Sequence, residues 1–360
     1  MQKPLLKKGI AVAIILLFLS VSVVPSTGTT IEKTSSSFNS NTLFVGGSGP
    51  GNYTRIQDAI DNASDGDTVF VYNGTYVENI VINKKMNLVG EDRFNTTIDG
   101  NMEREYVVKV LCDSVYISGF KIINAGDGIQ IYSYDNTIIK NNLTMNIWFG
   151  VAIYGGCDNI ICDNVIRNNC GGVLLHSHSQ NNHILENKII ENLGGYISTG
   201  VELYDSSHNE IIGNLISGST VNVFLTDSCE NTVSNNLIEN ARQKGIYIFF
   251  MSHHNIISNN TFINTSWGIQ IEANGNKIIY NNFINNIGHA HFTVFNPFFV
   301  PRFNYNKWDR NYWDNWIGLT NPSFSKFPKI IFGAFIRSRI PISWLQFDWH
   351  PAKEPYDIGV

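Results

Sequence analysis

An Asn repeat runs through the middle of the chain and constrains the fold more than any other feature. A first Asn recurs every 21 to 27 residues, and a second Asn follows each one five positions later. Ile or Val stands two positions after each first Asn, and Leu, Ile or Phe stands seven positions after it. The seven first residues are Asn136, Asn159, Asn182, Asn209, Asn231, Asn255 and Asn276. A fixed period of about 20 to 50 residues is typical of solenoids, propellers and repeat arrays.

A second column precedes each copy and begins with Gly, or in one copy Asn. Its members are Gly128, Gly150, Gly172, Gly200, Asn222, Gly245 and Gly268, each followed by Ile or Val. Gly and Asn tolerate a left-handed backbone, so the column predicts a turn. Between such turns only short apolar strands fit. We therefore predict an all-β, right-handed parallel β-helix over residues 43–290, with about eleven coils spaced by about 4.8 Å.

The aligned Asn columns predict hydrogen-bonded ladders, because a side-chain amide both donates and accepts and can bond its copy one coil away. The two ends of a solenoid must be covered. We expect residues 291–360, which lose the repeat and are rich in aromatics, to form a C-terminal cap or tail. The predicted N-terminal cap is a short helix that Thr54 caps, with an apolar face of Ile56, Ala59, Ile60 and Ala63.

The N-terminus carries the pattern of an export signal. Three lysines precede an apolar run over residues 10–24, and Pro25 and a polar segment follow. This pattern predicts a signal peptide at residues 1–28 and a flexible lead-in at residues 29–42. The run is shorter than the roughly 20 residues that cross a bilayer, so an uncleaved anchor is the weaker alternative. We expect a secreted, cell-surface or periplasmic protein without a transmembrane span in the mature chain.

Charge and cysteine content exclude several classes. The chain has 25 basic and 30 acidic residues, a formal net charge of −5, and no basic run outside the N-terminus. A nucleic-acid partner is therefore not expected. Five cysteines form no CxxC motif and are odd in number, so they predict neither a zinc ribbon nor a complete disulfide framework. At least one thiol should be free.

Several short motifs carry a family resemblance. They are Y-T-R-I-Q-D-A-I at 53–60, G-D-T-V-F-V-Y-N-G-T-Y-V-E at 66–78, N-L-V-G-E at 87–91 and N-Y-W-D at 311–314. Together with the Asn repeat, they make the chain resemble the NosD-type family of pectin-lyase-like β-helix proteins, named for a periplasmic copper-binding protein. The resemblance implies export, a right-handed β-helix, and either copper delivery to nitrous-oxide reductase or, in surface relatives, association with carbohydrate.

Strand alternation predicts which side chains point outward. Counted from the Gly column, offsets one and three face the core, so offsets two and four face solvent. The outward candidates for ligand binding are Tyr132, Tyr154, His176, Glu202, Tyr204 and Tyr247. Aromatic side chains in line on stacked coils predict a flat platform for sugar rings, with acids and amides nearby for hydroxyl groups. The alternatives are that the C-terminal tail covers these rings or that they only fill a β-surface.

Two further groups of residues suggest chemistry. Asp205 and Asp227 share one offset on adjacent coils, which predicts carboxylates about 5 Å apart, near the separation in retaining glycosidases. An Asx turn is the alternative for each. His176 and His178 are the candidate copper ligands, with solvated turn histidines as the alternative. Asp65-Gly66-Asp67 suggests calcium, although the other ligands of an EF-hand loop are missing and a turn explains it.

Taken together, these features favour an exported, non-catalytic protein that binds a polysaccharide or cell-envelope glycan. One alternative is a periplasmic copper-binding accessory for the maturation of a copper enzyme. The other is a polysaccharide lyase or glycosidase, but the sequence lacks the adjacent Asp pair, G-H-G and R-I-K of polygalacturonase-type enzymes. Envelope proteins are further possible partners, and no cofactor other than copper or calcium is suggested.

Overall fold

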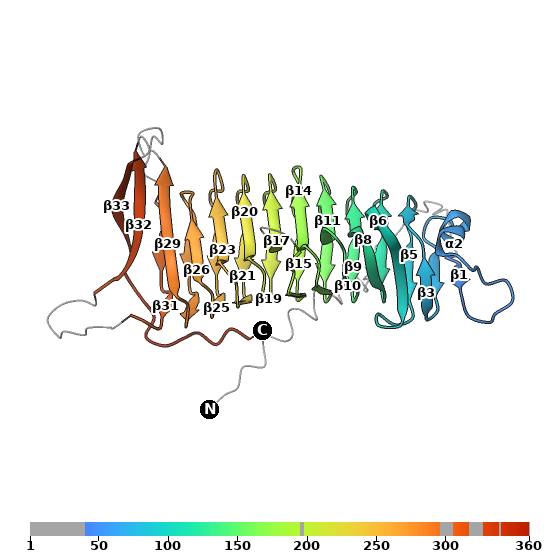
Figure 1. Cartoon of the computed structure of the whole chain (residues 1–360). Helices are drawn as coiled ribbons and strands as arrows, with labels where there is room; N and C mark the ends of the chain where they lie inside the picture. The colour runs from blue at the N-terminus through green and yellow to red at the C-terminus, as the bar shows by residue number, and fades with distance from the viewer. Residues whose placement is uncertain (1–39, 195–197, 296–304, 317–326, 338–339, 360) are drawn as a thin grey trace, which may run out of the picture. The chain divides into compact units, whose positions relative to one another are not determined.

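The described part of the chain is a right-handed parallel β-helix of about 11 coils (Figure 1). This confirms the predicted fold class. The expected signal peptide lies outside the described residues, as does most of the lead-in. The computed structural model describes residues 40–194, 198–295, 305–316, 327–337 and 340–359. No helix among these residues has the length and hydropathy that would be needed to cross a membrane.

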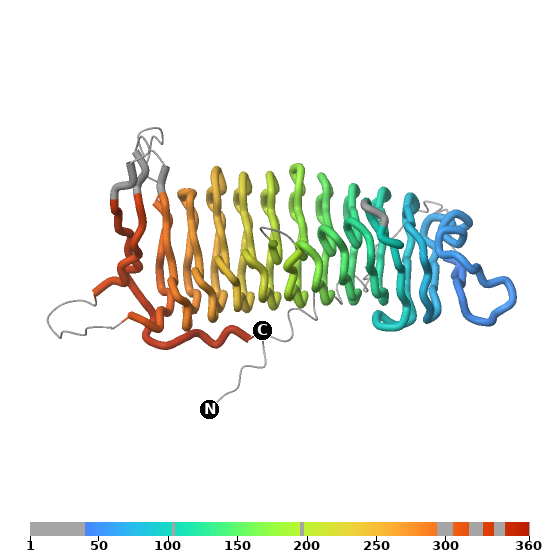
Figure 2. The backbone as a smooth tube through the Cα atoms, in the orientation of Figure 1, coloured from blue at the N-terminus to red at the C-terminus, as the bar shows by residue number. Residues whose placement is uncertain are grey.

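The strand pairings define three parallel sheets, which form the walls of the solenoid. The backbone winds through successive coils along the length of the solenoid (Figure 2). Sheet 1 contains β1 (Thr42–Val45), β2 (Thr68–Val71), β5 (Asn87–Gly90), β7 (Tyr116–Ser118), β9 (Thr137–Ile139), β12 (Ile160–Cys162), β15 (His183–Leu185), β18 (Glu210–Ile212), β21 (Thr232–Ser234), β24 (Ile256–Ser258), β27 (Lys277–Ile279) and β30 (Lys307–Asp309). Sheet 2 contains β3 (Gly74–Val77), β6 (Thr96–Val110), β8 (Lys121–Ile131), β10 (Asn142–Thr144), β13 (Val165–Arg167), β16 (Lys188–Ile190), β19 (Leu215–Ser217), β22 (Leu237–Glu239), β25 (Thr261–Ile263), β28 (Asn282–Ile284) and β31 (Tyr312–Trp313).

Sheet 3 positions the candidate functional residues. The long strands β6 and β8 continue from sheet 2 into this sheet. Its other members are β4 (Ile80–Ile82), β11 (Phe149–Tyr154), β14 (Gly171–His176), β17 (Thr199–Tyr204), β20 (Val221–Thr226), β23 (Lys244–Phe249), β26 (Trp267–Ile271), β29 (Gly288–Phe295) and β32 (Lys329–Arg337). The apolar columns at offsets one and three face the interior and are fully buried from Ile129 and Ile131 to Ile269 and Ile271.

Two Asn ladders run along the solenoid, as the repeat predicts. Each Asn donates its backbone N–H and its Nδ2 to the Oδ1 of the Asn one coil later, as Asn164 does to Asn187 at 3.0 Å for both bonds. Its Nδ2 also donates to a carbonyl of the preceding coil, here that of Ile138 at 2.8 Å. Each ladder has an eighth member beyond the seven predicted: Asn306 accepts from Asn276 in the first, and Asn311 accepts from Asn281 in the second. A third, shorter ladder that was not predicted joins Asn146, Asn169 and Asn192.

The prediction that the Gly column marks a left-handed turn is wrong. None of its members has a positive φ; the left-handed residue is instead often the one just before a ladder Asn, such as Asp135 (φ 56°) or Asp158 (φ 58°). Close packing between coils explains the Gly residues of the column, although Asn222 is accommodated in one coil. A Cβ on Gly172 would lie 2.3 Å from the backbone oxygen of Gly200, and one on Gly150 would lie 2.4 Å from Cγ2 of Ile166.

The N-terminal cap is a helix, α2 (Ile56–Asn62), with three core-facing residues buried. The expected cap by Thr54 is wrong, because the N-cap position is Arg55 and its side chain makes no capping bond. Glu78, which follows β3, supplies the cap instead. Its carboxylate accepts the backbone N–H groups of Ile56 at 2.8 Å and Gln57 at 3.1 Å, two donors that a helix leaves unsatisfied at its start.

The C-terminal end closes on one carboxylate. Parallel pairing continues beyond the expected boundary at residue 290, because β30 and β31 form a further coil that contains the N-Y-W-D motif. Asp348, at the end of β33 (Ile340–Asp348), is fully buried and accepts both donors of Asn311. It also accepts the Trp313 indole N–H and the backbone N–H groups of Arg310 and His350. Asp348 therefore ends the ladder that runs from Asn141 to Asn311.

Candidate functional site

The predicted outward side chains lie at the ends of the sheet 3 strands, in register from coil to coil. Tyr154 pairs with His176, and His176 pairs with Tyr204. Tyr132 directly follows Ile131, which pairs with Ile153. Tyr132 and Tyr204 are each 43% exposed, while Tyr154 and His176 are half-buried. We call these four side chains the aromatic ladder.

The rings of the aromatic ladder pack against one another along the solenoid. Tyr132 stacks on Tyr154 with ring centroids 5.2 Å apart and planes 20° apart, and His176 stacks on Tyr204 at 4.8 Å and 7°. A tilted contact at 6.0 Å joins the two pairs. The expected flat platform is therefore absent from the ladder, since the stacked faces cover each other. The ladder presents ring edges and hydroxyl groups instead.

A buried carboxylate lies beneath the start of the aromatic ladder. Asp127 is fully buried, and its oxygens accept hydrogen bonds from Gln130 Nε2 at 2.8 Å, the Phe149 backbone N–H at 2.9 Å and the Tyr154 hydroxyl at 3.3 Å. Burial raises the pKa of Asp127 above its usual value, although these bonds oppose the shift. Burial and the charge of Asp127 also raise the pKa of Tyr132.

Asp127 was not among the site residues predicted from the sequence, although its position in the repeat carries a signal. It stands one position before the Gly column, where the other six copies carry no acid: Phe149, Gly171, Thr199, Val221, Lys244 and Trp267. A lone acid in an otherwise neutral or basic column is the kind of departure from a repeat that marks a site. Lys109, from β6, extends the same group, with its Nζ 5.2 Å from the Tyr132 ring centroid.

Glu202 and Tyr247 occupy two further parts of this face. Glu202 is half-buried in β17, accepts a hydrogen bond from Thr199 Oγ1 at 3.0 Å, and has its pKa raised by burial. Tyr247 stacks on Phe224 at 5.2 Å and lies 5.4 Å from Phe249. We call Phe224, Tyr247 and Phe249 the distal cluster. The Nζ of Lys244 lies 3.7 Å from the Tyr247 ring centroid.

Asp205 and Asp227 lie at equivalent turns on adjacent coils, directly after β17 and β20. Both residues have a left-handed backbone conformation, with φ of 50° and 49°. The backbone N–H of Asp205 donates a hydrogen bond to the carbonyl oxygen of Thr226 at 3.1 Å. The Asp205 carboxylate contacts His178 Nδ1 at 2.9 Å across one coil. The structure thus gives both residues a turn conformation, and a catalytic role for the pair remains a prediction.

The two candidate copper ligands have separate partners. His176 stacks within the aromatic ladder and bonds the hydroxyl of Ser177, whereas His178 bonds Asp205. Similar contacts between a histidine and an acid on adjacent coils occur at His183–Glu210 (2.9 Å) and His208–Glu230 (3.5 Å). The His178–Asp205 contact is therefore one of several surface ion pairs of the same kind.

Other donors in the described ranges do not assemble a metal site either. These ranges contain no group of three or more His, Cys, Asp or Glu side chains able to hold an ion, and their five cysteines are separate, free and half-buried. Within the described ranges these side chains do not converge on a three-ligand site, and copper binding remains a prediction. At the suggested calcium turn, Asp67 accepts the backbone N–H groups of Asn41 and Ser64, and Asp65 accepts that of Lys85.

Comparison with known proteins identifies the family. The family described as "Periplasmic copper-binding protein (NosD)" matches residues 60–220 and 196–316. The chain belongs to the NosD family. The aromatic ladder and the distal cluster both lie inside the matched region, whereas β32 and β33 lie beyond it.

The individual proteins that resemble this chain match it over a short segment or at low sequence identity. A "Cell surface glycoprotein" of Methanothermus fervidus is 33% identical over 107 residues, which are 29% of this chain and only 18% of that protein. ORF18 of Geobacillus virus E2 has a TM-score of 0.55 and 16% identity over 80% of this chain and 59% of that one. DFA-IIIase from Arthrobacter chlorophenolicus A6, without its lid and in complex with GF2, has a TM-score of 0.54 and 12% identity over 76% of this chain and 88% of that one. These structural similarities show the fold alone.

Proposed function

We propose that this NosD-family protein is an exported, non-catalytic protein that binds a polysaccharide of the cell envelope along the outer face of sheet 3. The observation that carries the proposal is the line of aromatic edges, hydroxyl groups, amides and acids on successive coils. It runs from Tyr132 through the aromatic ladder to the distal cluster. The periplasmic and cell-surface locations in the descriptions of the family and the curated relative support export.

The composition of this face suits a hydroxyl-rich linear polymer. Tyr hydroxyls donate and accept hydrogen bonds, Glu202 accepts them, and Gln270 does both. Each coil adds one such group about 4.8 Å further along. A chain lying parallel to the solenoid axis would make many weak contacts, and the second and later contacts form at a high effective concentration. Binding of this kind does not require exposed ring faces.

The two acids of raised pKa on this face do not form a glycosidase pair with each other. Asp127 and Glu202 are the two acids on this face whose pKa burial raises, and they lie three coils apart in the strand register. Three coils correspond to about 14 Å. The paired carboxylates of glycosidases lie about 5 to 9.5 Å apart, so these two acids are too far apart to act on one glycosidic bond.

A glycan array with the purified protein, run with calcium and with chelator, tests the proposal. The informative variant is Tyr132→Ala/Tyr204→Ala, which removes the two exposed ends of the aromatic ladder without emptying the core. We expect it to lose at least about tenfold in affinity for the bound polymer. Tyr132→Phe/Tyr204→Phe keeps the stacking and loses only the hydroxyls, so an intermediate loss is expected.

Phe94→Ala is the matched control, because this exposed ring lies away from sheet 3, just before β6. It should bind like the unmodified protein. Equal losses in Phe94→Ala and in the tyrosine variant, or no binding of any polysaccharide, would contradict the proposal. Shortening of the bound polymer would contradict the non-catalytic part alone and would direct attention to Asp205 and Asp227.

A further inference from the structure

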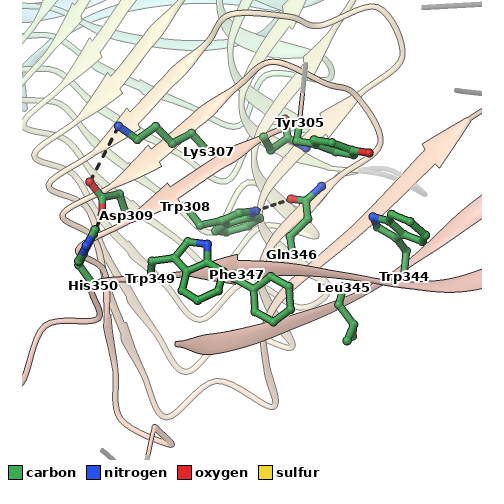
Figure 3. Close-up of a pocket in the computed structure, with 11 residues that line it drawn as sticks. Tyr305, Lys307, Trp308, Asp309, Trp344, Leu345, Gln346, Phe347, Trp349 and His350 are labelled. Atoms are coloured by element: carbon green, nitrogen blue, oxygen red, sulfur yellow. Dashed lines mark hydrogen bonds and ion pairs between the residues drawn. The ribbon is translucent and has the colours of Figure 1, made fainter. Parts of the chain in front are cut away.

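A second candidate site lies at the C-terminal end, between the last coil and β33. A cavity of about 510 Å³ is bounded there by β30 and the residues just before it on one side and by β33 on the other (Figure 3). Ligand pockets commonly measure about 300 to 1,000 Å³. The pocket shares no lining residue with the outer face of sheet 3, where the proposed polysaccharide surface lies.

The amide of Gln346 is held in one orientation and aimed into this pocket. Gln346 is 5% exposed, and its Oε1 accepts a hydrogen bond from the indole N–H of the buried Trp308. That bond directs Nε2 the other way, toward the space between Tyr305 and Trp344 (Figure 3). Nε2 is buried, and none of the described residues accepts a hydrogen bond from it. A buried amide with two unused N–H donors calls for an acceptor oxygen on a ligand.

The opposite end of the pocket supplies an acceptor. The Asp309 carboxylate bonds His350 Nδ1 at 2.7 Å and lies 3.9 Å from Lys307 Nζ. These contacts hold the carboxylate in place, and an ionised carboxylate can accept several hydrogen bonds at once. A ligand that spans the pocket must therefore accept hydrogen bonds at one end and donate them at the other, as sugar hydroxyl groups do.

The walls of the pocket are aromatic. Trp349 is 60% exposed and packs against Phe347 with ring centroids 5.2 Å apart, and Trp308 lies at the base. Unlike the rings of the aromatic ladder, Trp349 contributes a large exposed surface. Aromatic surfaces pack well against the C–H faces of sugar rings, while a few placed polar groups fix the orientation of a ligand.

We propose that this pocket binds one sugar residue, the end unit of a glycan, with a ring hydroxyl oxygen accepting from Gln346 Nε2, another hydroxyl donating to Asp309, and the ring packed against Trp349. The proposal does not rest on the polysaccharide surface of sheet 3. One wall of the pocket, from Trp344 to His350, lies beyond the residues that match the NosD family, whereas the other wall, which includes Asp309, lies within them.

A titration of the full chain with a panel of neutral, N-acetylated and acidic methyl glycosides tests the proposal, with tryptophan fluorescence and calorimetry as readouts. We expect saturable binding of at least one panel member. Trp349→Ala should weaken it about tenfold or more, because the exposed indole can be removed without opening the core. Gln346→Leu should weaken it similarly, and a melting curve will show whether this variant folds.

Phe332→Ala is the matched control, since this exposed ring lies on the neighbouring strand β32 and outside the pocket. It should bind normally, as should Tyr132→Ala/Tyr204→Ala, which separates this site from the sheet 3 surface. The proposal is overturned if no glycoside binds, if Trp349→Ala binds as well as the unmodified protein, or if the Phe332 control loses as much as Trp349→Ala.

Discussion

Side-chain amides are satisfied in different ways in the middle of the solenoid and at its C-terminal end. In the middle, each ladder amide donates to an identical amide one coil later, and its hydrogen-bonding capacity is satisfied by the repeat itself. After β31 the described residues form no further coil with a ladder Asn; Asp348 takes the donors of Asn311, while Gln346 keeps an unused Nε2. The comparison teaches that the repeat satisfies the amides of its own ladders, whereas the end of the ladder requires a residue of another type, Asp348.

The strongest test of this comparison is removal of the terminal acceptor. Asp348→Ala leaves five N–H donors without their carboxylate, so we expect a loss of about 4 kcal/mol in unfolding free energy or failure to fold. Asp348→Asn keeps one acceptor oxygen and should cost about 1 to 2 kcal/mol. Thermal melts and limited proteolysis of the C-terminal end measure both. If Asp348→Ala melts like the unmodified protein, the carboxylate does not close the ladder.

Removal of a rung from the middle should have the next largest effect. Asn187→Ala removes an Oδ1 that accepts two bonds from Asn164 and an Nδ2 that bonds Asn214 and Ile161. We expect a loss of about 2 to 3 kcal/mol, measured by thermal or urea unfolding. Asn62→Ala, at an exposed position in α2, is the matched control and should change stability little. Equal melting temperatures for the two variants would contradict a stabilising role for the ladder.

A smaller, pH-dependent effect is expected at Asp127. Because burial raises its pKa in the folded state, the folded protein holds this proton more tightly than the unfolded chain does. The resulting stability is complete below the unfolded value of about 3.9 and is lost as pH rises through the folded value. The melting temperature of the unmodified protein minus that of Asp127→Asn should therefore fall as pH rises from about 3.5 to neutrality. A difference that rises with pH would contradict the raised pKa.

The smallest effect is expected for copper. Since His176 and His178 have separate partners, the double variant His176→Ala/His178→Ala should change any measured copper affinity by less than about twofold. His183→Ala/His208→Ala, which breaks two comparable cross-coil contacts, is the matched control for calorimetry. A loss of about tenfold or more that is confined to the first variant would instead place a copper site at these two histidines.

The sequence predicted the parts of the molecule that repeat. The Asn and apolar columns indicated the β-helix, the ladders and the orientation of Tyr132 and Tyr204, because one rule applies to every coil. The Gly column was misread, since its cause is a contact with the next coil, as between Gly172 and Gly200, rather than a local backbone angle. Residue spacing alone does not show such a contact.

The parts that do not repeat could not be derived in the same way. Glu78 caps α2 from 22 residues away, and Asp348 bonds Asn311 from 37 residues away. No periodicity relates these pairs. The platform expected at the aromatic ladder was wrong in a different respect: strand alternation predicts that a ring points outward, but the angle between neighbouring rings depends on side-chain packing. The pocket at Gln346 requires both a β-hairpin and the last coil, and neither segment indicates it alone.

The uniform direction of the Asn ladders also bears on how such a protein can change over evolution. In the middle of each ladder, the Oδ1 of an Asn accepts from the coil before it, and its Nδ2 donates to the Oδ1 of the Asn in the coil after it. One coil in the middle is therefore interchangeable with another, and a duplication or deletion of a whole coil reconnects the ladders without any new type of bond. Such an event would change the length by about 4.8 Å and leave both caps as they are, so the reach of the molecule can vary independently of its ends.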